Sequence, residues 1–256
     1  PVQLGGSLSI EMHEVGTNPF NPSPIPPICY EIQAAYEHPE AALDFLKQQV
    51  RAPRLPEYLN HFEEEARRIK IKAENRMTVV SMMHRAMDDV CDMVSEVKPF
   101  QFVPTIFKIK TNFIIFSAIT GIFHRKLLKV YHSANKKENQ AAKKVAANQQ
   151  SSSCSRITLS RAAQQLEGLH QMETPWAGIN KLEAFFNIIL DGIGVDKPQA
   201  DDIMPALSAG IANCHSIAPY LVSTFTYISD IWPTEGLEEK LTYIIVSCTI
   251  AGSSFC

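Results

Sequence analysis

Apolar residues recur every three or four positions along most of this chain, and this helical spacing is the feature that most limits its fold. From about residue 40 onward, successive apolar stripes follow the i, i+3, i+4 pattern of amphipathic helices, and prolines separate several of them. No convincing alternation of apolar and polar residues, which is typical of half-buried strands, occurs in the sequence. The spacing therefore predicts an all-α protein.

The stripes are spread over the whole chain after residue 40. Named by their first and last apolar residues, the stripes are Ala42–Val50, Tyr58–Ile69, Val79–Val94, Phe113–Val130, Leu159–Leu169, Leu182–Ile189, Ile203–Ile211, Tyr220–Ile228 and Leu237–Cys248. The opposite face of the second stripe carries glutamates and arginines, which indicates a solvated surface. Each stripe is expected to bury one face of a helix against its neighbours.

The most apolar stretch of the sequence is FIIFSAITGIF, Phe113–Phe123, which has basic residues on both sides. A transmembrane helix needs about 20 apolar residues, so this stretch is too short to span a bilayer, and we predict no transmembrane segment. It is typical of a buried helix. Peripheral membrane association through a surface helix is the alternative that the basic flanks leave open.

Two segments depart from the helical pattern and divide the chain. Residues 1–39 are rich in Pro, Gly, Asn and Ser, which predicts a Pro-rich flexible tail. Residues 133–156 carry Lys, Asn, Gln, Ala and Ser with almost no large apolar residue, which predicts a polar insert or linker, flexible or partly helical. We therefore expect a helical bundle over residues 40–132 and a second helical unit over residues 157–256.

Composition and motifs argue against several functional classes. The formal net charge is -3, from 24 Lys+Arg and 27 Asp+Glu, which is unlike a polybasic nucleic-acid-binding protein. The six cysteines are scattered without metal-ligand spacing, so we expect no metal and a reducing, cytoplasmic setting. The sequence contains no phosphate-binding glycine loop, zinc-protease helix or serine-hydrolase elbow. We therefore expect no covalent enzymatic chemistry and no cofactor.

The tripeptide Asn18-Pro19-Phe20 lies within the Pro-rich segment. This motif is the one that EH domains of the endocytic machinery recognise, so it predicts EH-domain proteins as partners. The alternative is a turn whose phenylalanine packs onto the rest of the molecule.

Two aspartates, Asp201 and Asp202, stand at the expected start of a helix in QADDIMPALSAGI. Carboxylates are favoured there, because the first turn presents free N–H groups and the positive end of the helix dipole. Pro205 is expected in the first turn, where its missing N–H costs little. From the residues alone, this is an acidic helix start with an early proline.

Three motifs in chain order resemble the Vps-nine domain, the exchange-factor module for endosomal Rab GTPases of the Rab-five type. They are QADDIMPALSAGI at 199–211, LVSTFTYISDI at 221–231 and EEKLTYIIVSCTIAGSSF at 238–255. The segments DFLKQQVRAP and RKLLKVYHS are similar to the helical bundle that precedes this domain in Rabex-type exchange factors. Together the resemblance covers about residues 42–255.

The resemblance implies a helical bundle packed against a layered helical Vps-nine-type domain. It also implies a guanine-nucleotide exchange factor that promotes GDP release from a Rab-five-like small GTPase. In this family the first aspartate of the pair enters the GTPase nucleotide site as an acidic finger, which places Asp201 in that role. Pro205 would shape the adjacent groove, and Tyr243 would contact the switch region. The implied location is the cytoplasm, peripheral on early endosomes, in vesicle trafficking and endocytosis.

The sequence departs from the family pattern at Val246, where the family usually has threonine. Valine cannot form the hydrogen bond of that hydroxyl, a loss of about 0.5–1.5 kcal/mol, which implies exchange reduced roughly tenfold or a different partner GTPase. The alternative function is a non-catalytic Vps-nine-like scaffold that binds a GTPase without accelerating exchange. Because the chain begins at Pro1 and ends at Cys256, near where the family's last helix continues, it is compatible with being part of a longer protein.

Overall fold

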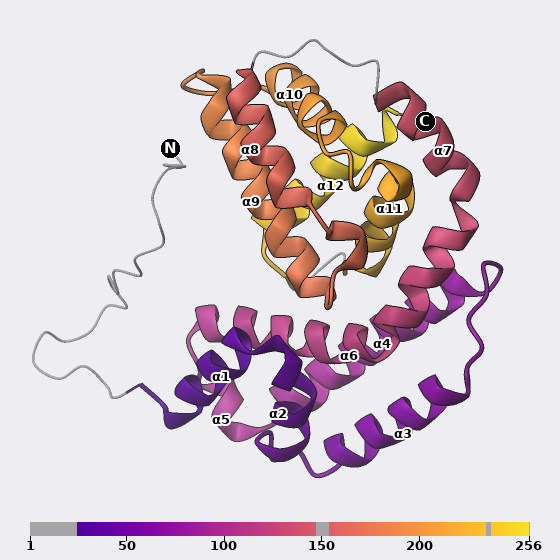
Figure 1. Cartoon of the computed structure of the whole chain (residues 1–256). Coiled ribbons are helices and arrows are strands. Elements are labelled where there is room, and N and C mark those ends of the chain that lie inside the picture. The colour runs from indigo at the N-terminus through magenta and orange to yellow at the C-terminus, as the bar shows by residue number, and fades with distance from the viewer. Residues whose placement is uncertain (1–24, 147–153, 234–236, 256) are drawn as a thin grey trace, which may run out of the picture.

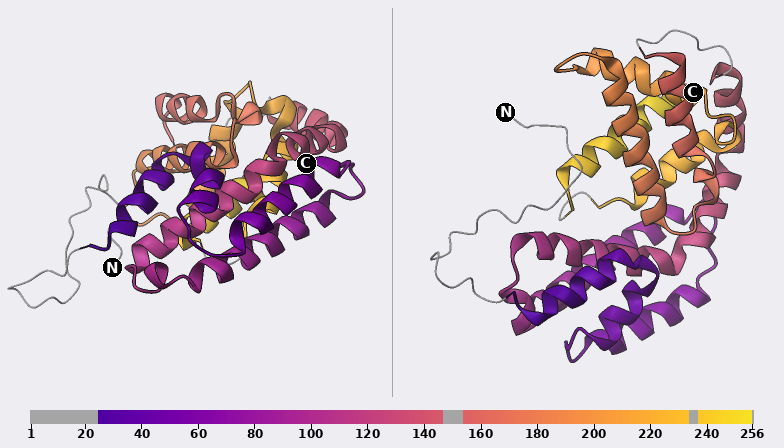
Figure 2. Two further views of the ribbon diagram at one scale, coloured as in Figure 1. Left: turned by 90° about the horizontal axis from the view of Figure 1, so that it is seen from below. Right: turned by 60° about the vertical axis from the view of Figure 1, so that its left-hand side comes forward.

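Two groups of helices, one above the other, make up the described part of the molecule (Figure 1; Figure 2, right). The computed structural model describes residues 25–146, 154–233 and 237–255. The regular elements in these ranges are all α-helices or short 3₁₀ turns, so the predicted all-α class is confirmed. The N-terminal group lies below in Figure 1 and the C-terminal group above, and α7 (Lys136–Ala146) rises along one side between them.

The N-terminal group is built around one long helix, α6, which packs against α1, α2, α3 and α4. Its elements are α1 (Pro27–Glu37), η1 (Pro39–Ala41), α2 (Ala42–Gln48), α3 (Leu55–Arg68), α4 (Arg76–Ser95), α5 (Lys98–Gln101) and α6 (Thr105–Ala134). The segment Lys98–Pro104 contains the short α5 before the chain turns into α6. The apolar stripes of α2, α3 and α4 face inward, as their spacing predicts.

The central helix α6 is longer than the apolar stretch that the sequence singles out. By length and composition alone it is able to cross a membrane, a test that core helices of soluble proteins also pass. Of its most apolar window, 56% is buried inside the structure. Phe113, Ile119 and Phe123 are each almost fully buried, as expected for a core helix. The predicted buried helix is therefore observed at Phe113–Phe123.

The C-terminal group surrounds a second apolar interior, in which α9 contacts α8, α10 and α12. Its elements are α8 (Arg156–Leu166), η2 (Leu169–Gln171), α9 (Pro175–Ile193), α10 (Ala200–Ala212), η3 (Ala218–Tyr220), α11 (Leu221–Ile231) and α12 (Glu239–Ser253). Thr174 begins α9 by accepting a hydrogen bond from the backbone N–H of Ala177. At the other end of α9, Gly194 adopts a φ of 73°, a left-handed conformation that glycine reaches without a steric penalty.

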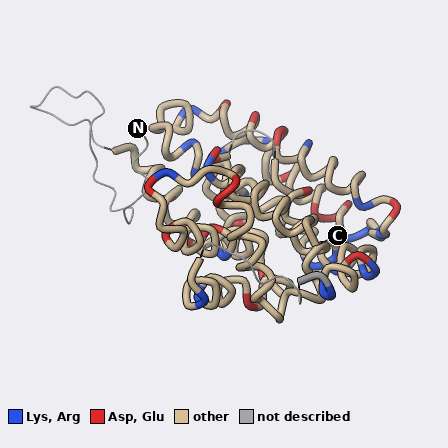
Figure 3. Tube along the Cα trace, turned by 90° about the horizontal axis from the view of Figure 1, so that it is seen from above, with Lys and Arg blue, Asp and Glu red and all other residues tan. Residues whose placement is uncertain are grey.

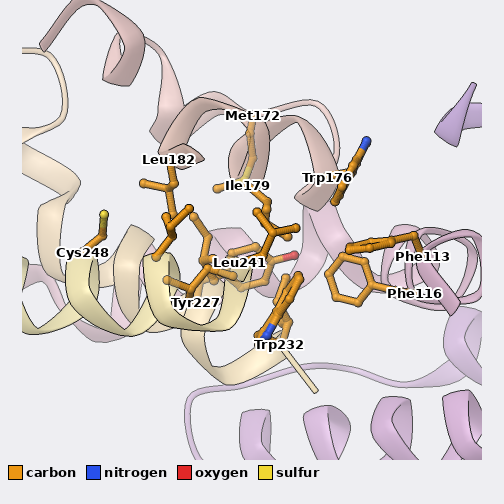
Figure 4. Packing of buried hydrophobic residues seen from close by; sticks show 14 of the residues in the cluster. Phe113, Phe116, Met172, Trp176, Ile179, Leu182, Tyr227, Trp232, Leu241 and Cys248 are labelled. Carbon is orange, nitrogen blue, oxygen red and sulfur yellow. The ribbon is translucent and has the colours of Figure 1, made fainter. Parts of the chain in front are cut away.

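Aromatic side chains fill the joint between the two groups (Figure 4). Phe113 and Phe116 project from α6 towards Trp176 of α9 and towards Trp232, which follows α11. The ring centroids of Phe113 and Trp176 lie 4.7 Å apart, and those of Phe116 and Trp232 lie 5.4 Å apart. These contacts make the interiors of the two groups continuous.

Hydrogen bonds also cross the joint. The Nε2 of His124 donates to the carbonyl oxygen of Met172 at 2.8 Å, because a carbonyl only accepts. Its Nδ1 therefore accepts from the hydroxyl of Tyr227 at 2.7 Å, which fixes the neutral ring. Burial lowers the pKa of His124 below its ordinary value of 6.5. Nearby, the hydroxyl of Tyr131 donates to Asp230 at 2.6 Å.

The expectation of a flexible tail over residues 1–39 is wrong for its last part. Residues 27–37 form α1, whose buried Cys29, Ile32 and Ala35 pack towards α6. The prolines that suggest extended chain stand at the start of the helix: Pro26 is the N-cap and Pro27 the first helical residue. Proline is favoured at that position because its fixed φ suits the first turn and no N–H partner is lost.

The polar insert over residues 133–156 is partly helical, which is one of the two forms that its composition predicts. Its residues 136–146 form α7, which contacts η3 and α11. Asn139 is buried and makes two hydrogen bonds to Ser223 in the first turn of α11: its amide donates to the hydroxyl at 3.0 Å, and its Oδ1 accepts from the backbone N–H at 3.1 Å. Ala142 is fully buried beside it. Small side chains and one satisfied amide, in place of large apolar residues, thus hold this helix.

Candidate functional site

The two aspartates at the start of α10 have different environments. Asp202 belongs to a capping box: its Oδ2 accepts from the backbone N–H of Gln199 at 3.0 Å, and the Gln199 side chain accepts from the Asp202 backbone. Asp201 is exposed, and within the described residues its carboxylate makes no hydrogen bond or ion pair. The cap therefore fixes the helix start and leaves Asp201 available to a partner.

Pro205 lies deeper in α10 than the sequence suggests. The helix begins at Ala200, which places Pro205 in its second turn, so the expectation of a first-turn proline is wrong. Proline has no N–H, and the carbonyl of Asp201 therefore lacks its usual donor at i+4, a position where proline costs about 3 kcal/mol. Asp201 and Pro205 share one side of the helix, and both are exposed.

The last helix, α12, carries a row of outward-facing apolar residues. Tyr243, Val246 and Ile250 are 51%, 47% and 54% exposed, and their spacing of three and four residues places them on one side of the helix. The opposite side of α12 is buried against α9, α10 and α11. The ring of Tyr243 meets the buried ring of Phe186 edge to face, with centroids 5.8 Å apart. This contact supports the tyrosine while half of it stays in solvent.

Helices α10 and α12 contact each other at the buried Ser208. Ser208 lies on the same side of α10 as Pro205, and its hydroxyl is 3.4 Å from that of Ser254, just beyond the end of α12. Ser254 in turn follows Ile250 by one helical turn. We call the surface formed by Asp201, Pro205, Tyr243, Val246 and Ile250 the α10–α12 face.

The α10–α12 face combines one free carboxylate with an apolar row. Further carboxylates, Glu238 and Glu239, are exposed at the start of α12, whereas Lys240 is paired with Glu183 at 2.8 Å. Elsewhere, positive and negative residues are interspersed over much of the trace (Figure 3). Among the described residues, no group of three or more His, Cys, Asp or Glu is placed to hold a metal ion. The face suits non-covalent binding of a partner that offers a cation beside an apolar surface.

Of the residues that the sequence nominates, Asp201 and Pro205 lie on one exposed side of α10, and Tyr243 and Val246 lie on one exposed side of α12; these two helices are in contact. Asn18, Pro19 and Phe20 lie outside the described residues. Ile250 was missed, although its spacing from Val246 continues the same side of α12. The sequence does contain the relevant signal, because an apolar residue outside the buried stripe of a helix indicates a candidate binding residue.

Comparison of the chain with models of protein families, with curated proteins and with solved structures gives no match in any of the three. The resemblance to the Vps-nine domain therefore rests on the sequence motifs alone.

Proposed function

We propose that this protein is a guanine-nucleotide exchange factor of the Vps-nine type, which promotes GDP release from a Rab-type small GTPase. The observation that carries the proposal is the unpartnered carboxylate of Asp201, held at the capped start of α10, a helix in contact with α12 and its exposed apolar row. The three motifs in family order support the same assignment.

In the proposed mechanism, Asp201 enters the nucleotide site of the GTPase. Its negative charge competes with the nucleotide phosphates for the phosphate-loop lysine and disfavours retention of Mg²⁺. Tyr243, Val246 and Ile250 pack against the switch region, with Pro205 beside them. No covalent bond forms, and exchange is accelerated because the factor binds the nucleotide-free GTPase more tightly than the nucleotide-bound form.

The capping box gives Asp201 a defined position in this mechanism. Because Asp202 and Gln199 satisfy each other's backbone groups, the helix start is held without using the carboxylate of Asp201. A carboxylate on a stiff helix end loses little conformational freedom when it binds.

The test is release of fluorescent GDP from a panel of Rab GTPases, with a Rab-five-like protein first. We expect Asp201→Asn to lower the exchange rate about tenfold or more, since a charge-assisted contact contributes about 1.5–3 kcal/mol. The matched control is Asp191→Asn, which removes an exposed carboxylate at the end of α9. Equal rates for wild type and Asp201→Asn would overturn the mechanism.

The second candidate, a scaffold that binds a GTPase without accelerating exchange, is favoured by Val246. This exposed apolar side chain stands where the family usually offers a hydroxyl. As an exchange factor, the protein should gain activity from Val246→Thr. Capture of the GTPase together with exchange at the background rate, in both wild type and Val246→Thr, would select the scaffold.

A further inference from the structure

The turn between α5 and α6, together with the first turn of α6, exposes two large apolar side chains. Phe102 is 75% exposed and Ile106 is 51% exposed. Of residues 101–106 only Val103 is buried, so the chain presents an outward-facing corner here. Exposed apolar residues are ordinary when single, but two of this size only four residues apart form a patch that water solvates poorly.

This corner is firmly attached to the bundle. Phe100 and Val103, on either side of Phe102, are each only 5% exposed, so these two buried side chains anchor the turn from inside. Pro104 caps the start of α6 with a φ of -56°. The corner therefore presents Phe102 and Ile106 on a short, well-supported projection.

The charges around the corner are predominantly positive. From residue 97 to residue 137 the chain contains no Asp or Glu. Lys98 and Lys108 are exposed on the two sides of the corner, while Lys110 is buried and donates to Gln33 of α1.

A neighbouring cavity of about 980 Å³ brings further charges to this end of the bundle. Lys98 and Phe100 contribute to its lining. Its other charged lining residues are Arg51, Arg54, Glu31 and Glu96. With Lys98, the lining therefore holds three cations and two anions, so the local excess is still positive.

We propose that the α5–α6 corner, formed by Lys98, Phe102, Ile106 and Lys108, inserts into the surface of an anionic lipid bilayer. The phenyl ring and the isoleucine enter the boundary between headgroups and acyl chains, and the two lysines lie at the level of the lipid phosphates. A lipid surface is the occupant that fits, because the patch is small, projects outward and has cations on both sides. A protein partner would need a broader complementary surface.

The position of the corner is compatible with simultaneous binding of a GTPase. In Figure 1, α5 lies at the bottom of the molecule in the N-terminal group, whereas α10 and α12 belong to the C-terminal group above it. This inference goes beyond the proposed function and does not depend on it, since membrane binding and nucleotide exchange are measured separately.

The test is flotation of the whole chain with vesicles of phosphatidylcholine alone or of phosphatidylcholine with phosphatidylserine. We expect the chain to float with the anionic vesicles and to bind neutral vesicles much more weakly. The double variant Phe102→Ser with Ile106→Ser should lose about tenfold or more in vesicle affinity. The control is Ile157→Ser, which removes a side chain that is also 75% exposed, on α8 of the other helical group.

Charge reversal tests the second half of the proposal. Lys98→Glu and Lys108→Glu should each weaken binding to anionic vesicles about fivefold, and added salt should weaken wild-type binding. The control is Lys72→Glu, because Lys72 is exposed on the α3–α4 connection, at the other end of the bundle from α5 (Figure 1). If Lys72→Glu weakened vesicle binding as much as Lys98→Glu does, the claim that binding is localised to the α5–α6 corner would be wrong.

Thermal unfolding measured on each variant distinguishes loss of the contact from loss of the fold. A folded Phe102→Ser/Ile106→Ser variant that floats as well as wild type overturns the proposal, and so does a wild-type chain that does not float. Exchange in solution without vesicles should be unchanged in this variant. A failure of the exchange proposal would therefore appear in the solution assay alone.

Discussion

The two helical groups expose their apolar side chains in different ways. In the C-terminal group, Tyr243, Val246 and Ile250 form a straight row along α12, about 10 Å long at 1.5 Å per residue. In the N-terminal group, Phe102 lies in the turn between α5 and α6, and Ile106 lies in the first turn of α6. A rigid row matches a groove or helix on another protein, whereas a projecting corner enters a surface that yields around it. The shape of an exposed apolar surface, a straight row or a corner, thus indicates the type of partner.

The same two groups share one interior. Helix α6 is the centre of the N-terminal group and also packs against α9 and α11. The joint contains both aromatic contacts and buried hydrogen bonds, so separating the groups would expose apolar rings and unsatisfied polar atoms together. The difference between the groups therefore lies in their outer surfaces, while their folding is expected to be coupled.

The largest expected effect is the loss of a buried ring at the joint. Phe116→Ala should lower the free energy of unfolding by about 3–5 kcal/mol, because it leaves a cavity beside Trp232. The only tryptophans of the sequence, Trp176 and Trp232, both lie at the joint, so their fluorescence reports it while circular dichroism reports all helices. In denaturant the two signals should change together, and separate midpoints would contradict coupled folding. Phe102→Ala, at an exposed phenylalanine, is the control and should cost under about 0.5 kcal/mol.

Removal of one hydroxyl at the joint should have a smaller effect. Tyr227→Phe keeps the ring but leaves Nδ1 of His124 without its donor in a buried position, which should cost about 1–3 kcal/mol. Tyr30→Phe removes a hydroxyl from a ring that is 67% exposed and serves as the control. Equal stability of Tyr227→Phe and wild type in denaturant unfolding would mean that the joint does not depend on this hydrogen bond.

The joint should also make stability depend on pH. Burial lowers the pKa of His124, His132 and His170 below the ordinary value of 6.5. Below that pH the unfolded chain therefore binds more protons at these histidines than the folded chain does. The free energy of unfolding should therefore fall as the pH drops below about 6.5 through the lowered pKa values. The charges on Arg125, near His124, and on His170, near His132, act in the same direction.

His124→Gln isolates the contribution of His124 to this pH dependence. The glutamine can accept from Tyr227 and donate to Met172 without titrating. Thermal unfolding at a series of pH values should show a shallower loss for this variant than for wild type. Unchanged pH dependence would assign the effect to other groups. His38→Gln, at an exposed histidine, is the control.

Much of the fold was predictable because most helices bury one regular stripe. The stripes of α3, α4 and α6 predict both the helices and their inner faces. The exceptions have local causes. Helix α1 begins with prolines, which also mark turns, and α7 is held by Asn139 and small residues, which no hydrophobic period reveals.

The candidate site was predictable in its residues but not in its arrangement. The motifs place Asp201 and Tyr243 on separate helices, and the sequence gives no indication that the two helices meet. The depth of Pro205 depends on where α10 begins, and helix boundaries are the least predictable feature of such patterns. The pairing of Gln199 with Asp202, which distinguishes the two aspartates, follows from that boundary.

A substitution in the exposed row of α12 should have the smallest effect on stability. It also allows the most direct comparison between the exposed apolar surfaces of the two helical groups. Ile250→Ser should change the free energy of unfolding by under about 0.5 kcal/mol, because the side chain is 54% exposed. It should nevertheless weaken GTPase binding about tenfold, measured by titration with the nucleotide-free GTPase, since an apolar contact at the proposed interface is lost. Ile157→Ser, on α8, should change neither quantity.

The same Ile250→Ser protein, tested with anionic vesicles, should bind them as wild type does, whereas the Phe102→Ser/Ile106→Ser protein should show the reverse pattern. If each variant lost both activities, the row and the corner would belong to one surface. The assignment of the GTPase to the row and of the membrane to the corner would then be wrong. Because both variants change exposed side chains and leave the joint intact, a loss confined to one partner is attributable to local contact rather than to unfolding.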